Sequence, residues 1–371
     1  MIHLYDIAVL GATPAGCAAA SYLARKKADV VLIDAPGGAN ESPLMDWAPR
    51  DFFSLRGLPR DMAKACKAKP FKNVRYYDAM LARQVDYTSR ATAGYCLKPS
   101  VLIKSLTANA IAAGAKTVDA GQHPAIGLSE DMVTVIGKTQ VRAKVLLVAQ
   151  SNPAEVMSDL AMPTRPSART SFVVAALDVP LGDAKHPRLD NMMHIVESKE
   201  RSELGMFFVY QKTLHLRVVS SSVATGTRAQ ELSTLLGGLQ REGILPATLS
   251  IDKAKGAVWF PPAGEALEME THVAKRCLLA GTAGGFADTI TGQTLSPSVR
   301  SAIIACDVAM EALKGGDLQN TLGKFKSEWR SELAESLRPP STSLHMLLPL
   351  LFVNNRIVAK FTGALLHGEP I

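Results

Sequence analysis

The first forty residues alternate between mostly apolar runs and a glycine-containing turn. Residues 5–10 form the first run, residues 11–16 (GATPAG) follow at once, and residues 17–27 are rich in small side chains. A second apolar run, 30–33, ends at Asp34. Such runs predict buried parallel strands, and the alanines between them predict a helix that lies close to the sheet. The order of strand, turn, helix, strand and acidic residue predicts a dinucleotide-binding unit.

The residues of this turn have the chemistry needed to bind a pyrophosphate. Gly11 permits the tight turn, Gly16 permits close helix packing, and the helix N-terminus offers unpaired N–H groups with a partial positive charge. Asp34 can accept hydrogen bonds from the ribose hydroxyls of an adenosine. Thr13 stands where a glycine usually lets the backbone approach the phosphates, so its side chain must point away from them or hydrogen-bond to them. The alternative is an α/β turn that binds nothing.

A second glycine-rich bend lies in residues 277–305 (CLLAGTAGGFADTITGQTLSPSVRSAIIA). An apolar strand, 278–280, opens into 281–285, and a helix is predicted to begin near Ser296 with Pro297 in its first turn. Small residues allow the backbone to approach a planar ligand, and the helix N-terminus can face an electron-rich edge of that ligand. The alternative is a connection made only for packing.

The wording of the two bends resembles that of the FAD-dependent oxidoreductases of the para-hydroxybenzoate hydroxylase and geranylgeranyl reductase superfamily. In that superfamily the first bend is usually GAGPAG, and the second is a strand delivering GDAAGF followed by DPxTGEG. Residues 98–116 and 145–156 are similar to further segments of the family, so the resemblance covers nearly the whole chain. It implies an α/β fold with α+β inserts: a discontinuous Rossmann-like FAD-binding domain (1–165 and 270–320), a β-rich substrate domain (166–269) and a helical C-terminal region (321–371).

The resemblance also implies FAD as the cofactor and a set of contacts at the positions that match the family's motifs. These contacts are Gly11, Ala12, Thr13, Pro14, Ala15, Gly16, Asp34, Lys98, Gly281, Thr282, Gly292, Gln293 and Thr294. Lys98 stands near the usual arginine. Because the flavin itself carries the electrons, the catalytic residues stay unknown, and the eight histidines show no spacing typical of a metal site.

Several family positions carry other residues in this chain. Thr282 replaces an aspartate that would hold the ribityl chain, Thr289 replaces a proline, and Thr294 replaces a glycine. Gln150 and Ser151 stand in place of an Asp-Gly pair. An uncharged hydrogen bond is worth about half of a charge-assisted one, so we expect a lowered affinity for the cofactor.

The middle of the chain is predicted to be a β-rich layer that covers the flavin. Its predicted strands are 170–177, 191–197 and 205–220. Residues 205–211 (GMFFVYQ) resemble a segment that lines the substrate chamber in the reductase branch of the superfamily. Phe208, Tyr210 and Trp259 are therefore candidate substrate residues, because aromatic walls exclude water. The alternative for these aromatics is a place in the core.

The positive charge of the chain is concentrated in one stretch. The net charge is +7, and between Arg56 and Arg75 there are seven basic residues against Asp61 alone. The spacing of Arg56, Arg60, Lys64 and Lys67 predicts a helix with a basic stripe. This stripe is either a solvated face or a docking surface for an acidic electron-donor or carrier protein, a phosphorylated substrate or a membrane. No nucleic-acid-binding module is visible.

Length and composition favour a folded protein with more than one domain. The 371 residues are 47% hydrophobic and 20% charged, which excludes collagen-like, coiled-coil and disordered chains. Five widely spaced cysteines and the lack of a signal peptide predict a reducing, cytoplasmic location. The apolar tail, 344–366, either packs, caps a hydrophobic cavity or lies on a membrane, and its longest run, 346–353, is too short to span a bilayer.

The expected function is that of an FAD-dependent oxidoreductase acting on a hydrophobic small molecule. The TGQ wording and the apolar tail favour double-bond reduction of a prenyl-like or polyketide-like substrate. One alternative is a flavin monooxygenase or a halogenase-like tailoring enzyme. The other is a non-catalytic protein of the same fold that binds a lipid or a protein partner.

Overall fold

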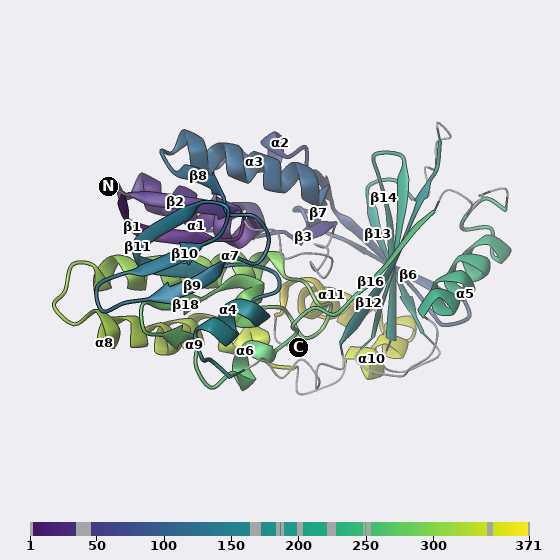
Figure 1. Cartoon of the computed structure of the whole chain (residues 1–371). Coiled ribbons are helices and arrows are strands. Elements are labelled where there is room, and N and C mark those ends of the chain that lie inside the picture. The colour runs from purple at the N-terminus through teal and green to yellow at the C-terminus, as the bar shows by residue number, and fades with distance from the viewer. Residues whose placement is uncertain are drawn as a thin grey trace.

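The computed structural model describes residues 3–34, 46–163, 172–182, 186, 189–198, 203–220, 228–247, 249, 254–339 and 344–369. These residues form two lobes, each built around one β-sheet, with a three-stranded sheet between them (Figure 1). The predicted α/β class, with a parallel sheet in the N-terminal lobe, is confirmed.

The first lobe contains an eight-stranded sheet. Its main path is β17 (Val273–Ala274), β18 (Cys277–Leu279), β11 (Gln140–Val148), β1 (Leu4–Leu10), β2 (Val30–Asp34) and β8 (Lys116–Asp119), and β9 (Ala125–Leu128) and β10 (Val133–Ile136) extend from β11. The pairs β2–β8, β1–β2, β1–β11 and β11–β18 are all parallel. Because β1 is central, its residues from Ile7 to Leu10 are completely buried.

Helices cover this sheet on both faces. They are α1 (Pro14–Arg25), α3 (Pro99–Ala112), α4 (Ala154–Asp159), α6 (Glu265–Glu268), α7 (Leu295–Ala312), α8 (Leu318–Gly323) and α9 (Phe325–Leu337). Helix α1 packs between α3 and α7. This close approach depends on the run from Cys17 to Ala20, whose small side chains are fully buried.

The second lobe contains a seven-stranded sheet. Its order is β16 (Lys255–Trp259), β12 (Val173–Pro180), β15 (Thr213–Ser220), β14 (Glu203–Tyr210), β13 (Met192–Glu197), β5 (Asn73–Tyr77) and β6 (Gln84–Thr88). Helix α5 (Arg228–Arg241) covers one face. The other face, called here the inner face, packs on the C-terminal segment made of α10 (Leu344–Leu347), η4 (Leu348–Phe352), η5 (Asn355–Ile357) and α11 (Val358–His367).

The small sheet joins β3 (Trp47–Pro49), β7 (Gly94–Cys96) and β4 (Lys69–Phe71). The predicted domain boundaries differ from this arrangement in two places. Strands β5 and β6 belong to the second sheet although they lie within 1–165. The predicted helical region is also divided, because Trp329 is buried in the core of the first lobe and Phe361 in that of the second. The division of the chain into domains stays a prediction.

The predicted basic helix is wrong. Only α2 (Met62–Ala65) is helical, because Gly57 adopts a φ of +95° and Pro59 follows it before the predicted helix can form. Arg56 is paired with Asp307, and Arg75 with Asp86. The other basic side chains of the stretch are exposed, namely Arg60, Lys64, Lys67, Lys69 and Lys72. An acidic partner for them stays a prediction.

Two further expectations concern the tail and the cysteines. The tail packs: Leu348, Leu351 and Phe361 are buried against the inner face of the second sheet. All five cysteines are buried and free, as their spacing predicted. None of the helices in the described part of the chain combines the length and apolarity needed to cross a membrane.

A buried histidine makes the first lobe sensitive to acid. His272 is fully buried among Phe286, Phe325 and Trp329, and its Nε2 lies 2.9 Å from the carbonyl oxygen of Gly284. The second ring nitrogen, Nδ1, has no partner among the described residues. Burial lowers the pKa of His272 from 6.5 to about 4, because a protonated ring would bring an unpaired N–H and a charge into an apolar core.

We therefore expect His272 to reduce stability in acid. The unfolded chain binds a proton below pH 6.5 and the folded chain does not until about pH 4, so the free energy of unfolding falls as the pH drops through this window. The fall due to His272 is about 3 kcal/mol. Urea unfolding at several pH values should show a flatter dependence for His272→Gln. The matched control is His123→Gln, at an exposed position, and an equal flattening in both variants would contradict the assignment.

Candidate functional site

The two predicted glycine bends meet at one edge of the first sheet. The first bend (residues 11–16) follows β1, and the second bend (residues 281–285) follows β18, which lies two strands away across β11. Because these strands are parallel, their carboxyl ends lie at the same edge. A Cβ atom placed on Gly281 would lie only 2.8 Å from the Cβ of Ala15. The bends are thus in direct contact.

The first bend is held by contacts within the protein. Gly11 has a φ of +109°, and a Cβ atom there would lie 2.7 Å from the backbone nitrogen of Gln150. Thr13 caps α1: its hydroxyl accepts a hydrogen bond from the N–H of Gly16 (3.2 Å) and donates to the carbonyl oxygen of Ala149 (2.7 Å). The hydroxyl therefore binds backbone, and Pro14 occupies the first helical position, where it has no N–H to satisfy.

The second bend is anchored by helix α7. The N–H of Gly281 donates to the hydroxyl of Ser301 (2.9 Å), which donates in turn to the carbonyl oxygen of Ser298 (2.9 Å). The hydroxyl of Ser298 donates to the carbonyl oxygen of Phe286 (3.1 Å). Gly281 has a φ of +62°, a conformation that favours glycine. Serines on one face of α7 thus determine where the second bend lies.

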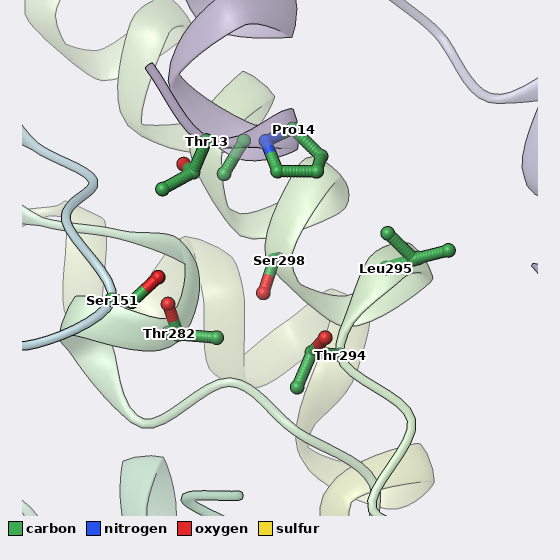
Figure 2. A pocket seen from close by; sticks show the side chains of 8 residues that line it. Thr13, Pro14, Ser151, Thr282, Thr294, Leu295 and Ser298 are labelled. Carbon is green, nitrogen blue, oxygen red and sulfur yellow. The ribbon is translucent and has the colours of Figure 1, made fainter. Parts of the chain in front are cut away.

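A small pocket lies between these elements: its space is about 230 Å³ when open solvent is included, but only about 10 Å³ of it can take a water-sized group. It is lined by Thr13, Pro14, Ala15, Ser151, Thr282, Thr294, Leu295 and Ser298. Figure 2 shows the side chains of both bends and of the start of α7 around this space. The N-termini of α1 and α7 both border it, and its lining contains five hydroxyl groups and no charged side chain. Among the described residues the pocket is therefore an uncharged site between two positive helix ends, and the surface that its lining exposes is mostly apolar.

One hydroxyl in this lining lacks a partner. Thr294 is 4% exposed, and its Oγ1 is buried without a hydrogen bond to the described part of the protein. A buried hydroxyl without a partner is costly, so a ligand oxygen or nitrogen that reaches it would gain a hydrogen bond. This observation fits a polar ligand in the pocket.

The loop between the second bend and α7 is organised by Asp288. This buried carboxylate accepts hydrogen bonds from the N–H groups of Ile290, Thr291 and Gln293. Gln293 then accepts from the N–H of Leu295 (2.8 Å) and donates to the carbonyl oxygen of Trp47 (2.6 Å). The amide of Gln293 is thus engaged with the protein at the start of α7, and its predicted cofactor contact stays a prediction.

Eight of the thirteen predicted contacts lie outside the pocket lining, and Gly292, Asp34 and Lys98 are among them. A Cβ atom on Gly292 would lie 2.6 Å from the ring of Phe172, so this glycine is required by packing between the lobes. Asp34 ends β2 with an exposed carboxylate that makes no hydrogen bond to the described residues. Partial burial and the nearby Asp119 raise the pKa of Asp34. Lys98 is exposed at the N-terminus of α3. Their roles stay predictions.

The three aromatic candidates are buried in the second lobe. Phe208 is 1% exposed and stacks on His215, and the hydroxyl of Tyr210 donates to the carbonyl oxygen of Lys67 (2.7 Å). Trp259 is 6% exposed. All three lie in the core on the inner face and none lines the pocket, so the structure favours the core alternative and their contact with substrate stays a prediction.

An ionic cluster on the inner face was not predicted from the sequence. Arg217 is 4% exposed and contacts the carboxylates of Asp46 and Asp178, the latter at 2.8 Å. The Nδ1 atom of His215 lies 3.0 Å from an oxygen of each carboxylate. Nη2 of Arg217 also lies 3.4 Å from Nδ1, but the two carboxylate oxygens are nearer and favour a hydrogen on this nitrogen. The signal in the sequence is the pair His215 and Arg217, which interrupts an otherwise apolar strand.

Three residues of this cluster have the chemistry of metal ligands. Atoms of Asp46, Asp178 and His215 lie within 4.8 Å of one another. Arg217, however, already contacts both carboxylates and supplies the positive charge that a metal ion would bring. The cluster is therefore an ion network centred on the buried Arg217.

The cluster is linked to the pocket through the chain. Asp46 precedes Trp47, whose carbonyl oxygen accepts the hydrogen bond from Gln293. The same glutamine side chain accepts from the N–H of Leu295, which lines the pocket. The peptide bond between Asp46 and Trp47 and the two hydrogen bonds of Gln293 therefore connect the ionic cluster to the start of α7.

Solved structures with this fold span almost the whole chain. One is a geranylgeranyl bacteriochlorophyll reductase-like protein from Thermoplasma acidophilum (TM-score 0.72, 15% identity, 100% of this chain and 98% of that chain). A second is the p-nitrophenol 4-monooxygenase PnpA from Pseudomonas putida (0.71, 15%, 98% and 95%). A third is the flavin-dependent brominase Bmp2 (0.66, 14%, 98% and 94%).

No family model matches the chain, and no curated protein sequence does. At 14–15% identity the structural likeness establishes the fold. The predicted resemblance is confirmed at this level: the chain has the Rossmann-like α/β fold shared by a reductase-like protein, a monooxygenase and a flavin-dependent brominase.

The ionic cluster yields a prediction about stability. In Arg217→Met, the largely buried carboxylate of Asp46 and the partly exposed carboxylate of Asp178 lose their counter-charge, so we expect a loss of about 3 kcal/mol in the free energy of unfolding. Urea denaturation measures this loss. The control is Arg75→Met, which breaks an ion pair with the more exposed Asp86 and should cost about 1 kcal/mol or less. Equal losses of unfolding free energy in the two variants would show that the Arg217 cluster stabilises the protein no more than an ordinary surface ion pair.

Proposed function

We propose that this protein is an FAD-dependent oxidoreductase that acts on a hydrophobic small molecule. The observation that supports it best is the contact between the two glycine bends, which places one small pocket between the N-termini of α1 and α7. Such an edge of a parallel sheet is where this class of fold binds its ligands. Two separate turns that build one pocket favour a cofactor site over a turn made only for packing.

The residues of the site fit a dinucleotide with a polar, uncharged connecting chain. The N–H groups at the start of α1 would hold the pyrophosphate, and Asp34 would hold the adenosine ribose. The hydroxyls of Thr282, Ser298 and Thr294 would take the polar groups that lie between the phosphates and the ring system. FAD, when bound, supplies hydride transfer or oxygen activation, and the protein supplies position and exclusion of water.

The uncharged lining affects how strongly this ligand would bind. Of the residues that the structure describes, no Asp, Glu, Lys or Arg lines the pocket. Binding would depend on neutral hydrogen bonds and on two helix ends, each of which contributes about 0.3–1 kcal/mol toward a negative group. We therefore propose that FAD is held reversibly and is lost in part during purification.

Within this class we propose double-bond reduction of a prenyl-like or polyketide-like substrate. The likeness to a reductase-like protein (TM-score 0.72) and the apolar C-terminal segment against the inner face support it. The alternative is a monooxygenase, supported by the likeness to the p-nitrophenol 4-monooxygenase (0.71). A non-catalytic binding protein of the same fold is the third candidate, supported by the lack of charged groups in the pocket.

Spectra and melting curves test the cofactor. We expect a visible flavin spectrum in the purified protein, or a rise in melting temperature when FAD is added, because a ligand at 100 times its dissociation constant stabilises the folded state by about 2.7 kcal/mol. ADP and riboflavin serve as partial ligands that report on each half of the site. Colourless protein with no shift for FAD would overturn the proposal and favour the binding protein.

Anaerobic and aerobic assays separate the two enzymatic candidates. A reductase should transfer electrons from the reduced flavin to a double bond without oxygen, whereas a monooxygenase should consume oxygen when a nicotinamide donor is present. Reduction of the bound flavin by NADPH and by dithionite, each under argon, shows which donor potential is needed. Oxygen consumption coupled to an aromatic substrate would replace the reductase by the monooxygenase.

A substitution at Thr294 should affect the stability of the free protein and its affinity for FAD in opposite directions. In Thr294→Val a buried hydroxyl without a partner becomes a methyl group, so we expect the free protein to be unchanged or more stable by up to about 1 kcal/mol. The affinity for FAD should fall about five- to tenfold, because a neutral hydrogen bond is worth about 1 kcal/mol. Calorimetry and urea unfolding measure the two effects.

The matched control is Thr291→Val in the same loop. The hydroxyl of Thr291 donates to Asp288 at 2.5 Å and does not line the pocket. We expect this variant to lose stability, since Asp288 loses a hydrogen bond in a buried place. A Thr294→Val protein that is destabilised and binds FAD as tightly as the wild type would show that the hydroxyl serves the protein and not a ligand.

A further inference from the structure

The C-terminal helical segment is apolar on both of its sides. Leu344, Leu348 and Leu351 are buried against the inner face. On the opposite side, Met346, Leu350 and Val353 are 63%, 48% and 78% exposed. Their spacing of four and three residues places them on one face of the segment. A surface helix normally has polar residues on its outer side, so this face lacks the pattern expected for contact with water.

A fourth apolar side chain belongs to the same surface. Met80 is 65% exposed in the turn between β5 and β6. Arg83, in the same turn, lies over the ring of Phe352 at 5.3 Å from its centroid, so this turn and η4 are neighbours. We call Met80, Met346, Leu350 and Val353 the tail surface. Figure 1 shows α10 at the lower edge of the second lobe.

The charge of the C-terminal segment itself has one sign. From residue 336 to residue 368 the sequence contains no Asp or Glu, although these make up 34 of the 371 residues. Arg356 and Lys360 are exposed and form no ion pair with the described residues. Arg83 is paired with Asp78. The C-terminal segment that carries the exposed apolar face therefore has two positive charges with no ion-pair partner among the described residues, whereas the charges of the β5–β6 turn are paired.

We propose that the tail surface binds an anionic lipid surface, with its apolar side chains at the acyl boundary and Arg356 and Lys360 at the headgroups. An apolar helix face with a cationic border is the pattern of segments that lie in the interface of a bilayer. A second copy of the chain fits less well. Two copies would bring equal positive charges together, and four side chains provide less than the roughly 800 Å² per partner of a stable interface.

This inference does not depend on FAD, but it deepens the proposed function if both hold. The buried side of the same segment contacts the inner face: Tyr76 packs on Phe361 at 5.5 Å between ring centroids and hydrogen-bonds to Thr362 at 2.6 Å. The C-terminal segment would then lie between the lipid and the second sheet. A hydrophobic substrate dissolved in the bilayer would thus be close to the lobe proposed to bind it.

Vesicle flotation tests the proposal with the full-length protein. We expect the wild type to float with phosphatidylcholine vesicles that contain phosphatidylglycerol, and to dissociate as salt is raised. The double variant Leu350→Glu, Val353→Glu should bind these vesicles at least about tenfold less tightly. Since both positions are exposed, its melting temperature should stay that of the wild type, which a thermal scan checks.

Matched variants separate this surface from general stickiness. The double variant Ile111→Glu, Ile136→Glu changes two apolar residues of the first lobe whose side chains are 52% and 48% exposed. It should leave vesicle binding unchanged. Arg356→Glu with Lys360→Glu should abolish the preference for phosphatidylglycerol. Equal losses in the first-lobe variant, or no flotation of the wild type on either vesicle, would overturn the proposal.

A second copy of the chain is the alternative to lipid on the tail surface. Light scattering of the wild type and of the Leu350→Glu, Val353→Glu variant resolves it. A wild-type dimer that becomes a monomer in this variant, without vesicle binding by either, would assign the surface to a second copy and overturn the lipid proposal. The flotation assay is repeated with protein that contains no FAD. Because lipid binding is then measured without the cofactor, a failure of the cofactor proposal does not change the result for the lipid proposal.

Discussion

The site depends on one close backbone contact. The first and second bends approach until Gly281 and Ala15 leave no room for a further carbon atom between them. This contact requires three parallel strands in the order β1, β11 and β18, a helix of small residues after the first bend, and serines on α7 that hold the second. A larger side chain at Gly281 would push the ends of β1 and β18 apart and so change the shape of the pocket between the two bends.

The pocket between the bends is lined by uncharged side chains among the described residues. Hydroxyl groups and helix ends take the place that carboxylates and basic side chains have in many nucleotide sites. Neutral groups impose a small desolvation cost and give a modest gain on binding. The charged groups of the region lie elsewhere, in the Arg217 cluster, where they join the second sheet to the Asp46–Trp47 segment and, through Gln293, to α7.

Local patterns predicted the elements of the first lobe well and the connections between the lobes poorly. The strand at 5–10, the turn at 11–16 and the second bend were visible because apolar runs and glycines are short-range signals. The place of β5 and β6 in the second sheet was not visible, since strand pairing over more than a hundred residues has no local mark. The basic helix failed because spacing alone ignored Gly57 and Pro59.

The amino-acid sequence by itself determined the α/β class, the two glycine bends, the reduced state of the cysteines and the apolar character of the tail. Each of these follows from composition or from neighbours along the chain. Only the tertiary structure decided that Thr13 binds backbone, that Thr294 lacks a partner, that Phe208 is in the core and that Arg217 meets Asp46. These facts concern side chains from distant segments, and their partners are chosen by packing, which no single stretch of sequence contains.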